Sequence, residues 1–189
     1  MKLKLISSIP PSVNHYLKHT YRGGYAHVYV TPEGKKYKAD FAEYVKAEVV
    51  KQGWNLSLFE DRHFYVDMVF YFNRIDMDSS NYDKCLLDAI TDTQLVWPDD
   101  NVALPRVNRV YYTKGEPYIE LEIYPVSYIG IFDNIQQLES FENQCSSCNR
   151  YGRNCSILAG AKQGFVQDYI TDNQCIKYCE MKKKKNKRR

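Results

Sequence analysis

Two pairs of aspartates and one lysine lie in a short stretch of the chain. Asp76 and Asp78 form one pair, Asp99 and Asp100 form a second, and Lys84 lies between the pairs. A hard divalent cation such as Mg2+ takes carboxylate oxygens and keeps several waters, so one or two carboxylates and a substrate phosphate complete its coordination. A metal held in this way activates a water for in-line displacement at phosphorus, and a nearby lysine stabilises the charge that develops. The pattern therefore predicts a Mg2+ site for phosphoryl chemistry.

The same residue types also have a purely structural interpretation. Clusters of Asp, Asn and Ser commonly form turns and helix caps. Ser80 followed by Asp83 has the spacing of a capping box, which would open a helix. Spacing alone leaves both alternatives open, a metal site and a set of turns.

A strand and a helix are predicted to bring these side chains together. Alternating apolar residues over 64–72 predict a strand with one buried face. The helix that follows has a buried stripe at helical spacing, made of Tyr82, Cys85, Leu86, Ala89 and Ile90. Asn81, Lys84 and Asp88 lie on a different, polar face. Three acidic groups and one lysine are therefore expected to converge where the strand, the start of the helix and the loop after Trp97 meet.

The other predicted elements complete an α+β fold. A strand is expected over 2–9, and an amphipathic helix over 35–52 that ends at Gly53. Strands at 107–112 and 118–124 are expected to form a hairpin with each other. This order of elements predicts a mixed β-sheet with helices packed on one face. The domain is predicted to span residues 1–126.

Residues 14–38 combine basic and aromatic side chains. This composition suits a phosphate backbone with exposed bases near a branch point. The candidate DNA-binding residues are Asn14, Lys18, Arg22, Lys35 and Lys36, together with Asn81 from the central stretch. A solvated loop is the alternative interpretation.

Two separated motifs resemble RusA-type Holliday junction resolvases. The run from Asp78 to Lys84, with Asp88-Ala89-Ile90 and the Asp99-Asp100 pair, is similar to the family signature D-x-D-N-x-x-K-x-x-x-D-A-L followed by D-D. The earlier run from Pro10 to Tyr16 resembles the P-P-S-x-N-x-x-Y opening of the family. The resemblance covers about residues 1–124.

The resemblance implies a role for each central residue. Asp78 and Asp100 would be metal ligands, Lys84 the catalytic lysine, Asp76 and Asp99 further candidates, and Asp88 a residue that holds the helix or the lysine in place. The chain departs from the signature at Ser80, which lies where the family has its second aspartate. Two alternatives follow: Asp76 supplies the missing carboxylate, or the site is weakened.

A cysteine-rich extension is predicted over 127–181. Five of the six cysteines fall there, namely Cys145, Cys148, Cys155, Cys175 and Cys179. In a cytosolic chain such density favours a metal over disulfides, and four thiolates close a structural zinc site. The simplest set takes the first three cysteines with either Cys175 or Cys179. A four-cysteine iron–sulfur cluster and free thiols are the alternatives.

The composition predicts a soluble, cytoplasmic protein. The net charge is only +3, but seven Lys or Arg residues lie among the last nine. No apolar run approaches the ~20 residues that a membrane span requires, and no signal-peptide core follows Met1. The basic tail at 182–189 is expected to be disordered, and either to add non-specific DNA affinity or to be a solvated end.

Together these patterns predict a Mg2+-dependent, structure-selective endonuclease that cuts four-way DNA junctions in recombination or repair. The resemblance implies a homodimer with one site in each subunit, in a phage or prophage setting. Two other functions stay open. One is a flap or branched-DNA nuclease with the same metal chemistry, and the other is a junction-binding protein whose metal site has decayed.

Overall fold

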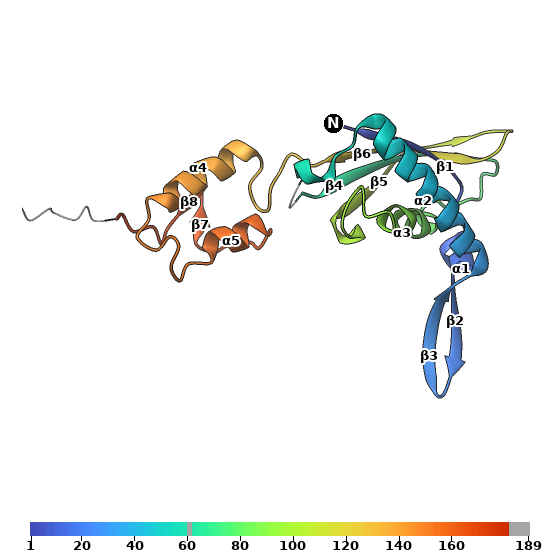
Figure 1. The fold of residues 1–189 in the computed structure, drawn as a ribbon, viewed down its shortest axis with the longest axis horizontal. Coiled ribbons are helices and arrows are strands. Elements are labelled where there is room, and N and C mark those ends of the chain that lie inside the picture. Colours follow the sequence, from blue (N-terminus) through green and yellow to red (C-terminus); the bar gives the residue numbers. More distant parts are fainter. Residues whose placement is uncertain (60–61, 182–189) are drawn as a thin grey trace, which may run out of the picture. The chain divides into compact units, whose positions relative to one another are not determined.

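The computed structural model describes residues 1–59 and 62–181, so the predicted basic tail at 182–189 lies outside the described residues. The chain divides into two compact units, Met1–Pro125 and Val126–Arg189 (Figure 1). Each unit has its own hydrophobic core. Within the described ranges, no helix is both long and apolar enough to cross a bilayer.

The first unit is built on a four-stranded mixed sheet with the strand order β1-β6-β4-β5. β1 (Leu3–Ser8) is antiparallel to β6 (Tyr118–Pro125), and β6 is antiparallel to β4 (Phe64–Phe72). β4 is parallel to β5 (Ala103–Tyr112). The predicted alternation in β4 is confirmed, because every second side chain from Phe64 to Phe72 is buried.

Two helices cover one face of this sheet. α2 (Pro32–Gln52) and α3 (Asp83–Thr91) contribute side chains such as Val45 and Ile90 to the same core as β1, β4 and β6. Gly53 ends α2 in the left-handed region, at a φ of 66°. The predicted fold class, a mixed sheet with helices on one face, is confirmed.

The predicted hairpin between the last two strands is wrong. β6 lies between β1 and β4, whereas β5 lies at the sheet edge beside β4. Burial explains this order. Ile119, Leu121 and Ile123 of β6 are buried, while β5 is mostly exposed and carries Pro105, which an edge strand tolerates. β4, α3 and β5 therefore form a crossover between parallel strands.

Short 3-10 turns connect these elements. They are η1 (Leu56–Phe59), η2 (Ser79–Asn81) and η3 (Asp100–Val102). η2 and η3 both pack against α3. The crossover thus brings the turn after β4 and the turn before β5 to the same helix.

A β-hairpin that the sequence pattern did not predict projects from the first unit (Figure 1). We call it the arm; it comprises β2 (Leu17–Arg22), β3 (Tyr25–Val30) and a turn of two glycines at positive φ. The short helix α1 (Val13–Tyr16) leads into it. Thr31 closes its base, because its N–H donates to the Tyr16 carbonyl (2.9 Å) and its hydroxyl to the His15 carbonyl (2.8 Å).

In its described residues, 126–181, the second unit has two helices and a pair of very short strands. The helices are α4 (Ile135–Ser146) and α5 (Ile157–Lys162), and the strands are β7 (Ile170–Thr171) and β8 (Gln174–Cys175). Phe132 and Phe141 pack against each other in its core, with ring centroids 5.4 Å apart.

Candidate active site

Lys84 lies in the first turn of α3, at the centre of a group of carboxylates. Its Nζ donates to Asp88 Oδ1 at 2.7 Å and to Asp100 Oδ2 at 2.9 Å. Asp88 is one turn further along α3, whereas Asp100 opens η3, so the lysine joins the helix to the loop. The Lys84 side chain is 49% exposed and the Asp100 side chain 31% exposed. The group is therefore accessible to a substrate.

The charges of this group are fixed at neutral pH. The hydrogen bonds that Lys84 donates to Asp88 and Asp100 raise the pKa of the lysine above its ordinary 10.5. The bond from Lys84 is also the main cause that lowers the pKa of Asp100 below 3.8. Lys84 is thus a permanent cation rather than a proton acceptor, and Asp100 is an ionised oxygen donor.

Asp78 lies directly before η2, on the turn that precedes α3. Its Oδ1 accepts hydrogen bonds from the Ser80 N–H at 3.0 Å and from the Ser80 hydroxyl at 2.9 Å. The serine that departs from the family signature therefore orients the first aspartate. The predicted capping box is wrong. The Ser80 hydroxyl donates to Asp78 instead of capping the helix, and α3 begins after Tyr82 without a side-chain cap.

The other two aspartates differ in their partners, since Asp99 interacts with Asp100 and contributes to its lowered pKa, whereas Asp76 pairs elsewhere. Asp76 forms a two-bond ion pair with Arg74, at 2.9 Å to Arg74 Nε and 2.7 Å to its guanidinium Nη2. This pairing lowers the pKa of Asp76. Asp99 is exposed immediately before η3 and makes no side-chain cap there. The structure therefore joins Lys84 to Asp88 and Asp100, and joins Asp76 to Arg74.

The chemistry of these donors fits Mg2+. As the side chains stand, no three His, Cys, Asp or Glu residues in ranges 1–59 and 62–181 are close enough to hold a metal ion. Mg2+ needs only one or two carboxylates, because waters and substrate phosphates supply its other ligands. Asp78 and Asp100 offer such oxygens from two turns that pack on one helix.

Tyr16 is a site residue that spacing did not reveal. Its hydroxyl donates to Asp88 Oδ2 at 2.6 Å, and its ring is buried. Burial first, and this hydrogen bond second, raise the pKa of Tyr16 above its ordinary value. A Cβ on Gly34 would lie 2.6 Å from Tyr16 Cδ2, so the glycine makes room for the ring. The available signal was the tyrosine that ends the run from Pro10 to Tyr16, which resembles the opening of the family.

Replacing Tyr16 with phenylalanine is expected to lower the free energy of unfolding by about 1.5–3 kcal/mol, because Asp88 loses a charge-assisted hydrogen bond in a partly buried place. The urea midpoint measures this change. Tyr29→Phe on the exposed arm is the control, and we expect a change within about 0.5 kcal/mol. Equal midpoints for Tyr16→Phe and wild type would contradict a supporting role for the hydroxyl.

The predicted DNA-binding residues lie on the arm and near its base. Lys18 pairs with Tyr29 and Arg22 with Tyr25, so these four side chains share one face of the arm. The opposite face is more apolar and carries Leu17, His19, Tyr21, Ala26, Val28 and Val30. Residues 14–30 contain no aspartate or glutamate. One face of the arm is therefore basic and aromatic.

The remaining predicted contacts lie on three elements. Asn14 is exposed in α1, Lys35 and Lys36 are exposed near the start of α2, and Asn81 is half-buried in η2. Lys35 and Lys36 follow Thr31, whose hydroxyl caps α2 by accepting the N–H of Gly34 at 3.2 Å. These lysines are thus placed close in sequence to the base of the arm.

The model of one protein family, Endodeoxyribonuclease RusA, matches residues 8–124. This range holds the whole lysine and aspartate group and covers more than half of the chain. The chain belongs to the RusA family. It is accordingly an endodeoxyribonuclease, in a family of Holliday-junction-resolving nucleases whose members generally depend on a divalent metal.

The RusA match ends at residue 124, so it does not extend into the cysteine-rich unit that begins at Val126. A comparison with curated proteins found no significant match. The family thus accounts for the first unit, and the second unit needs a separate explanation.

Proposed function

We propose that this RusA-family protein is a Mg2+-dependent nuclease that resolves four-way DNA junctions by paired phosphodiester hydrolysis. The observation that carries the proposal is the group formed by Lys84, Asp88 and Asp100, which lies in the part matched by the RusA family. A fixed cation beside partly exposed carboxylates is suited to a phosphate that must be bound and then cleaved.

Asp78 and Asp100 are the residues proposed to hold the metal, with Asp99 and Asp76 as further candidates. Mg2+ bound there would activate a water and neutralise the phosphoryl oxygens. Lys84 would donate to an oxygen of the scissile phosphate and stabilise its developing charge. Asp88, which also accepts from Tyr16, would keep the lysine in place when Asp100 turns to the ion.

The proposed assembly is a homodimer with one site in each subunit. A four-way junction is nearly two-fold symmetric, and resolving it needs a cut in each of two opposed strands. A symmetric dimer supplies two equivalent sites in matching positions. We propose that such a dimer acts in the cytoplasm during recombination or repair, in a phage or prophage setting.

The basic face of the arm is proposed to contact the DNA backbone. Lys18 and Arg22 supply charge, and Tyr25 and Tyr29 beside them supply rings on which unpaired bases can stack. Asn14, Lys35, Lys36 and Asn81 are proposed to add contacts between the arm and the catalytic group. Thr31 and Tyr16 support this arrangement, since they tie the base of the arm to Asp88.

Removing both cations of the arm, in Lys18→Ala/Arg22→Ala, is expected to weaken junction binding about tenfold at physiological salt. The slope of log affinity against log salt should fall by about 2, because two phosphate contacts are lost. Gel-shift titrations at several salt concentrations measure both quantities. Lys46→Ala/Lys51→Ala on α2 removes the same charge away from the arm and should leave the slope within error.

The test of the proposed function is a comparison of substrates. A four-way junction, a flap and a linear duplex of matched sequence are incubated with the wild-type protein in Mg2+. Cleavage of two opposed junction strands, with little cutting of the duplex, is expected. Preferential cutting of the flap would replace junction resolution with a different nuclease specificity. Tight junction binding without cleavage of any substrate would instead indicate a binding protein.

A further inference from the structure

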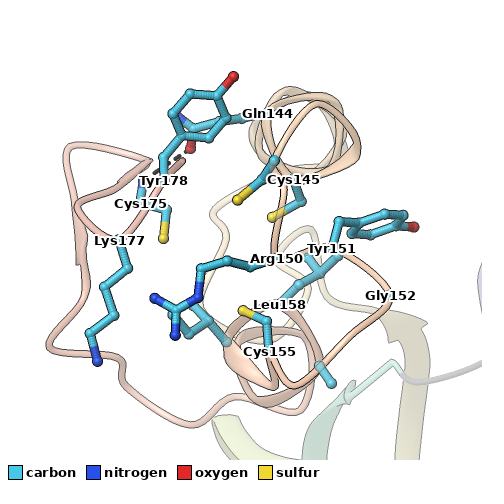
Figure 2. Close-up of a pocket in the computed structure, with 13 residues that line it drawn as sticks. Gln144, Cys145, Arg150, Tyr151, Gly152, Cys155, Leu158, Cys175, Lys177 and Tyr178 are labelled. Carbon is cyan, nitrogen blue, oxygen red and sulfur yellow. Dashed lines mark hydrogen bonds between the residues drawn. The ribbon is translucent and has the colours of Figure 1, made fainter. Parts of the chain in front are cut away.

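Four cysteines of the second unit line one pocket. Cys145 lies near the end of α4, Cys148 in the turn after it, Cys155 before α5 and Cys175 in β8. Figure 2 shows the side chains of Cys145, Cys155 and Cys175 turned toward the same space. Three separate chain segments therefore bring four thiols to the lining of one pocket.

The segments that carry these cysteines are held together by hydrogen bonds. The Cys175 N–H donates to Gln144 Oε1 at 2.9 Å, which ties β8 to the end of α4. The Asn149 N–H donates to the Cys179 carbonyl at 2.6 Å. These two hydrogen bonds tie the segment of Cys145 and Cys148 to the segment of Cys175 and Cys179 without any covalent link.

Backbone N–H groups surround the sulfur of Cys148. The Cys179 N–H donates to Cys148 Sγ at 3.4 Å, and the N–H groups of Arg150 and Tyr151 act on the same sulfur. These contacts hold the sulfur of this candidate ligand in place at the rim of the pocket. Cys179 itself is exposed and contributes its backbone.

The charged side chains that line the pocket are cationic. Arg150 and Lys177 line it, and no aspartate or glutamate occurs among the lining residues in the described part of the chain. Figure 2 shows the Arg150 side chain extending into the space between the cysteines. Four thiolates around a divalent ion leave a net negative charge, which two cations offset. The electrostatics therefore suit a thiolate centre.

The second unit also needs a source of stability besides its core. It spans fewer than 70 residues. Its buried core consists of Ile129, Phe132, Leu138, Phe141, Ile157 and Ala161. A single core in a domain of this size rarely supplies more than about 3–5 kcal/mol, and small domains commonly add disulfides or a structural metal. All six cysteines are free thiols in this structure, so no disulfide stabilises this unit, and a structural metal would.

We propose that Cys145, Cys148, Cys155 and Cys175 bind one structural Zn2+ that stabilises the second unit. Four thiolates at about 2.3 Å close a tetrahedral site and leave no open position for catalysis. As they stand, no three described side chains of the ligand types are close enough to hold an ion, so the predicted zinc site is not formed in the present rotamers. Binding requires the four thiols to move closer together and Arg150 to withdraw. The fourth ligand is Cys175 rather than Cys179, because Cys175 lines the pocket.

The zinc content of the full-length protein, purified in reductant without chelator, tests this inference. One Zn2+ per chain is expected in wild type, in Cys179→Ser and in Cys85→Ser. Cys155→Ser and Cys175→Ser are expected to bind zinc at least about tenfold more weakly against a competing chelator. Metal-free wild type, bound iron in place of zinc, or an equal loss in Cys179→Ser would overturn the proposal.

A ligand variant that fails to fold would also lack zinc. The coordination of the metal must therefore be measured directly on the wild-type protein. Replacing the metal by Co2+ is expected to give the intense visible absorption of tetrahedral thiolate coordination, which added Zn2+ should abolish. Folded wild type that gives no such spectrum with Co2+ would contradict the site. Neither the zinc content nor the Co2+ spectrum depends on DNA cleavage. A failure of the zinc proposal can therefore be distinguished from a failure of the proposed nuclease function.

Discussion

Asp78→Asn and Asp100→Asn are each expected to slow junction cleavage in Mg2+ by at least about 100-fold while junction binding is retained. Loss of an outer partner of a metal site already costs about 10–100-fold, and these two residues are proposed to be direct ligands. Asparagine keeps the size of the side chain and removes its charge, so the loss reports on the metal rather than on packing. Single-turnover cleavage of a labelled junction measures the rate, and a gel shift in Ca2+ or EDTA measures binding.

Asp40→Asn is the matched control for these two variants, because Asp40 is an exposed carboxylate on α2. Its cleavage rate is expected to equal that of wild type. Ser80→Ala extends the test, since it removes one of the two hydrogen bonds that orient Asp78. A partial loss is expected there, smaller than that of Asp78→Asn. Wild-type cleavage by Asp78→Asn and Asp100→Asn would contradict the assigned ligands.

Lys84→Met is expected to reduce cleavage by about 10²–10³-fold, the usual effect of removing one preorganised group that stabilises transition-state charge. Methionine retains much of the length of the side chain and lacks the ammonium. Stability should change little, by less than about 1 kcal/mol, because the Lys84 side chain is half-exposed and solvent screens its ion pairs. Urea unfolding beside single-turnover cleavage separates the two effects.

Lys84→Arg is the conservative comparison. Arginine keeps the charge but presents a planar fork in place of a compact ammonium, so we expect a rate between those of wild type and Lys84→Met. A rate for Lys84→Met within a few fold of wild type would show that the lysine only joins Asp88 to Asp100.

The pH dependence of the lysine pair follows from the directions of its pKa shifts. The raised pKa of Lys84 makes its contribution complete below 10.5 and lost only as the pH rises past the folded value. The lowered pKa of Asp100 makes its contribution complete above 3.8 and lost as the pH falls past the folded value. The stability difference between wild type and Lys84→Met should therefore be constant between pH 5 and 9. A difference that changes sharply within this interval, measured by urea unfolding, would contradict these shifts.

Much of the first unit could be predicted because its elements have strong local patterns. The alternation in β4 and the helical stripe from Cys85 to Ile90 each define one buried face. The pairing of β5 and β6 could not be predicted from sequence adjacency. Their order in the sheet depends on which strand lies inside the sheet, with a strand on each side, and which lies at its edge. The burial of Ile119, Leu121 and Ile123 places β6 inside, but this burial exists only once all four strands are assembled. The arm was missed because its exposed strands lack the apolar alternation of a half-buried strand.

The site was predictable as a set of residue types but not as a set of contacts. The expectation that Asp88 holds the lysine agrees with its 2.7 Å hydrogen bond from Lys84. The bond from Tyr16 to Asp88 joins residues 72 positions apart, and no local pattern contains it. Ser80 was expected to cap the helix, but the chain folds so that its hydroxyl reaches Asp78 two residues earlier. Side-chain partners of this kind depend on turns whose geometry the sequence leaves open.

The most direct test of the central claim is a Mg2+ titration of junction cleavage with the wild-type protein and Asp78→Asn. Cleavage of a labelled four-way junction should rise with Mg2+ and saturate for wild type, vanish in EDTA, and stay at background for Asp78→Asn at every concentration. Junction cutting by wild type that persists in EDTA, or an Asp78→Asn curve that matches wild type, would contradict a metal centre built on this aspartate.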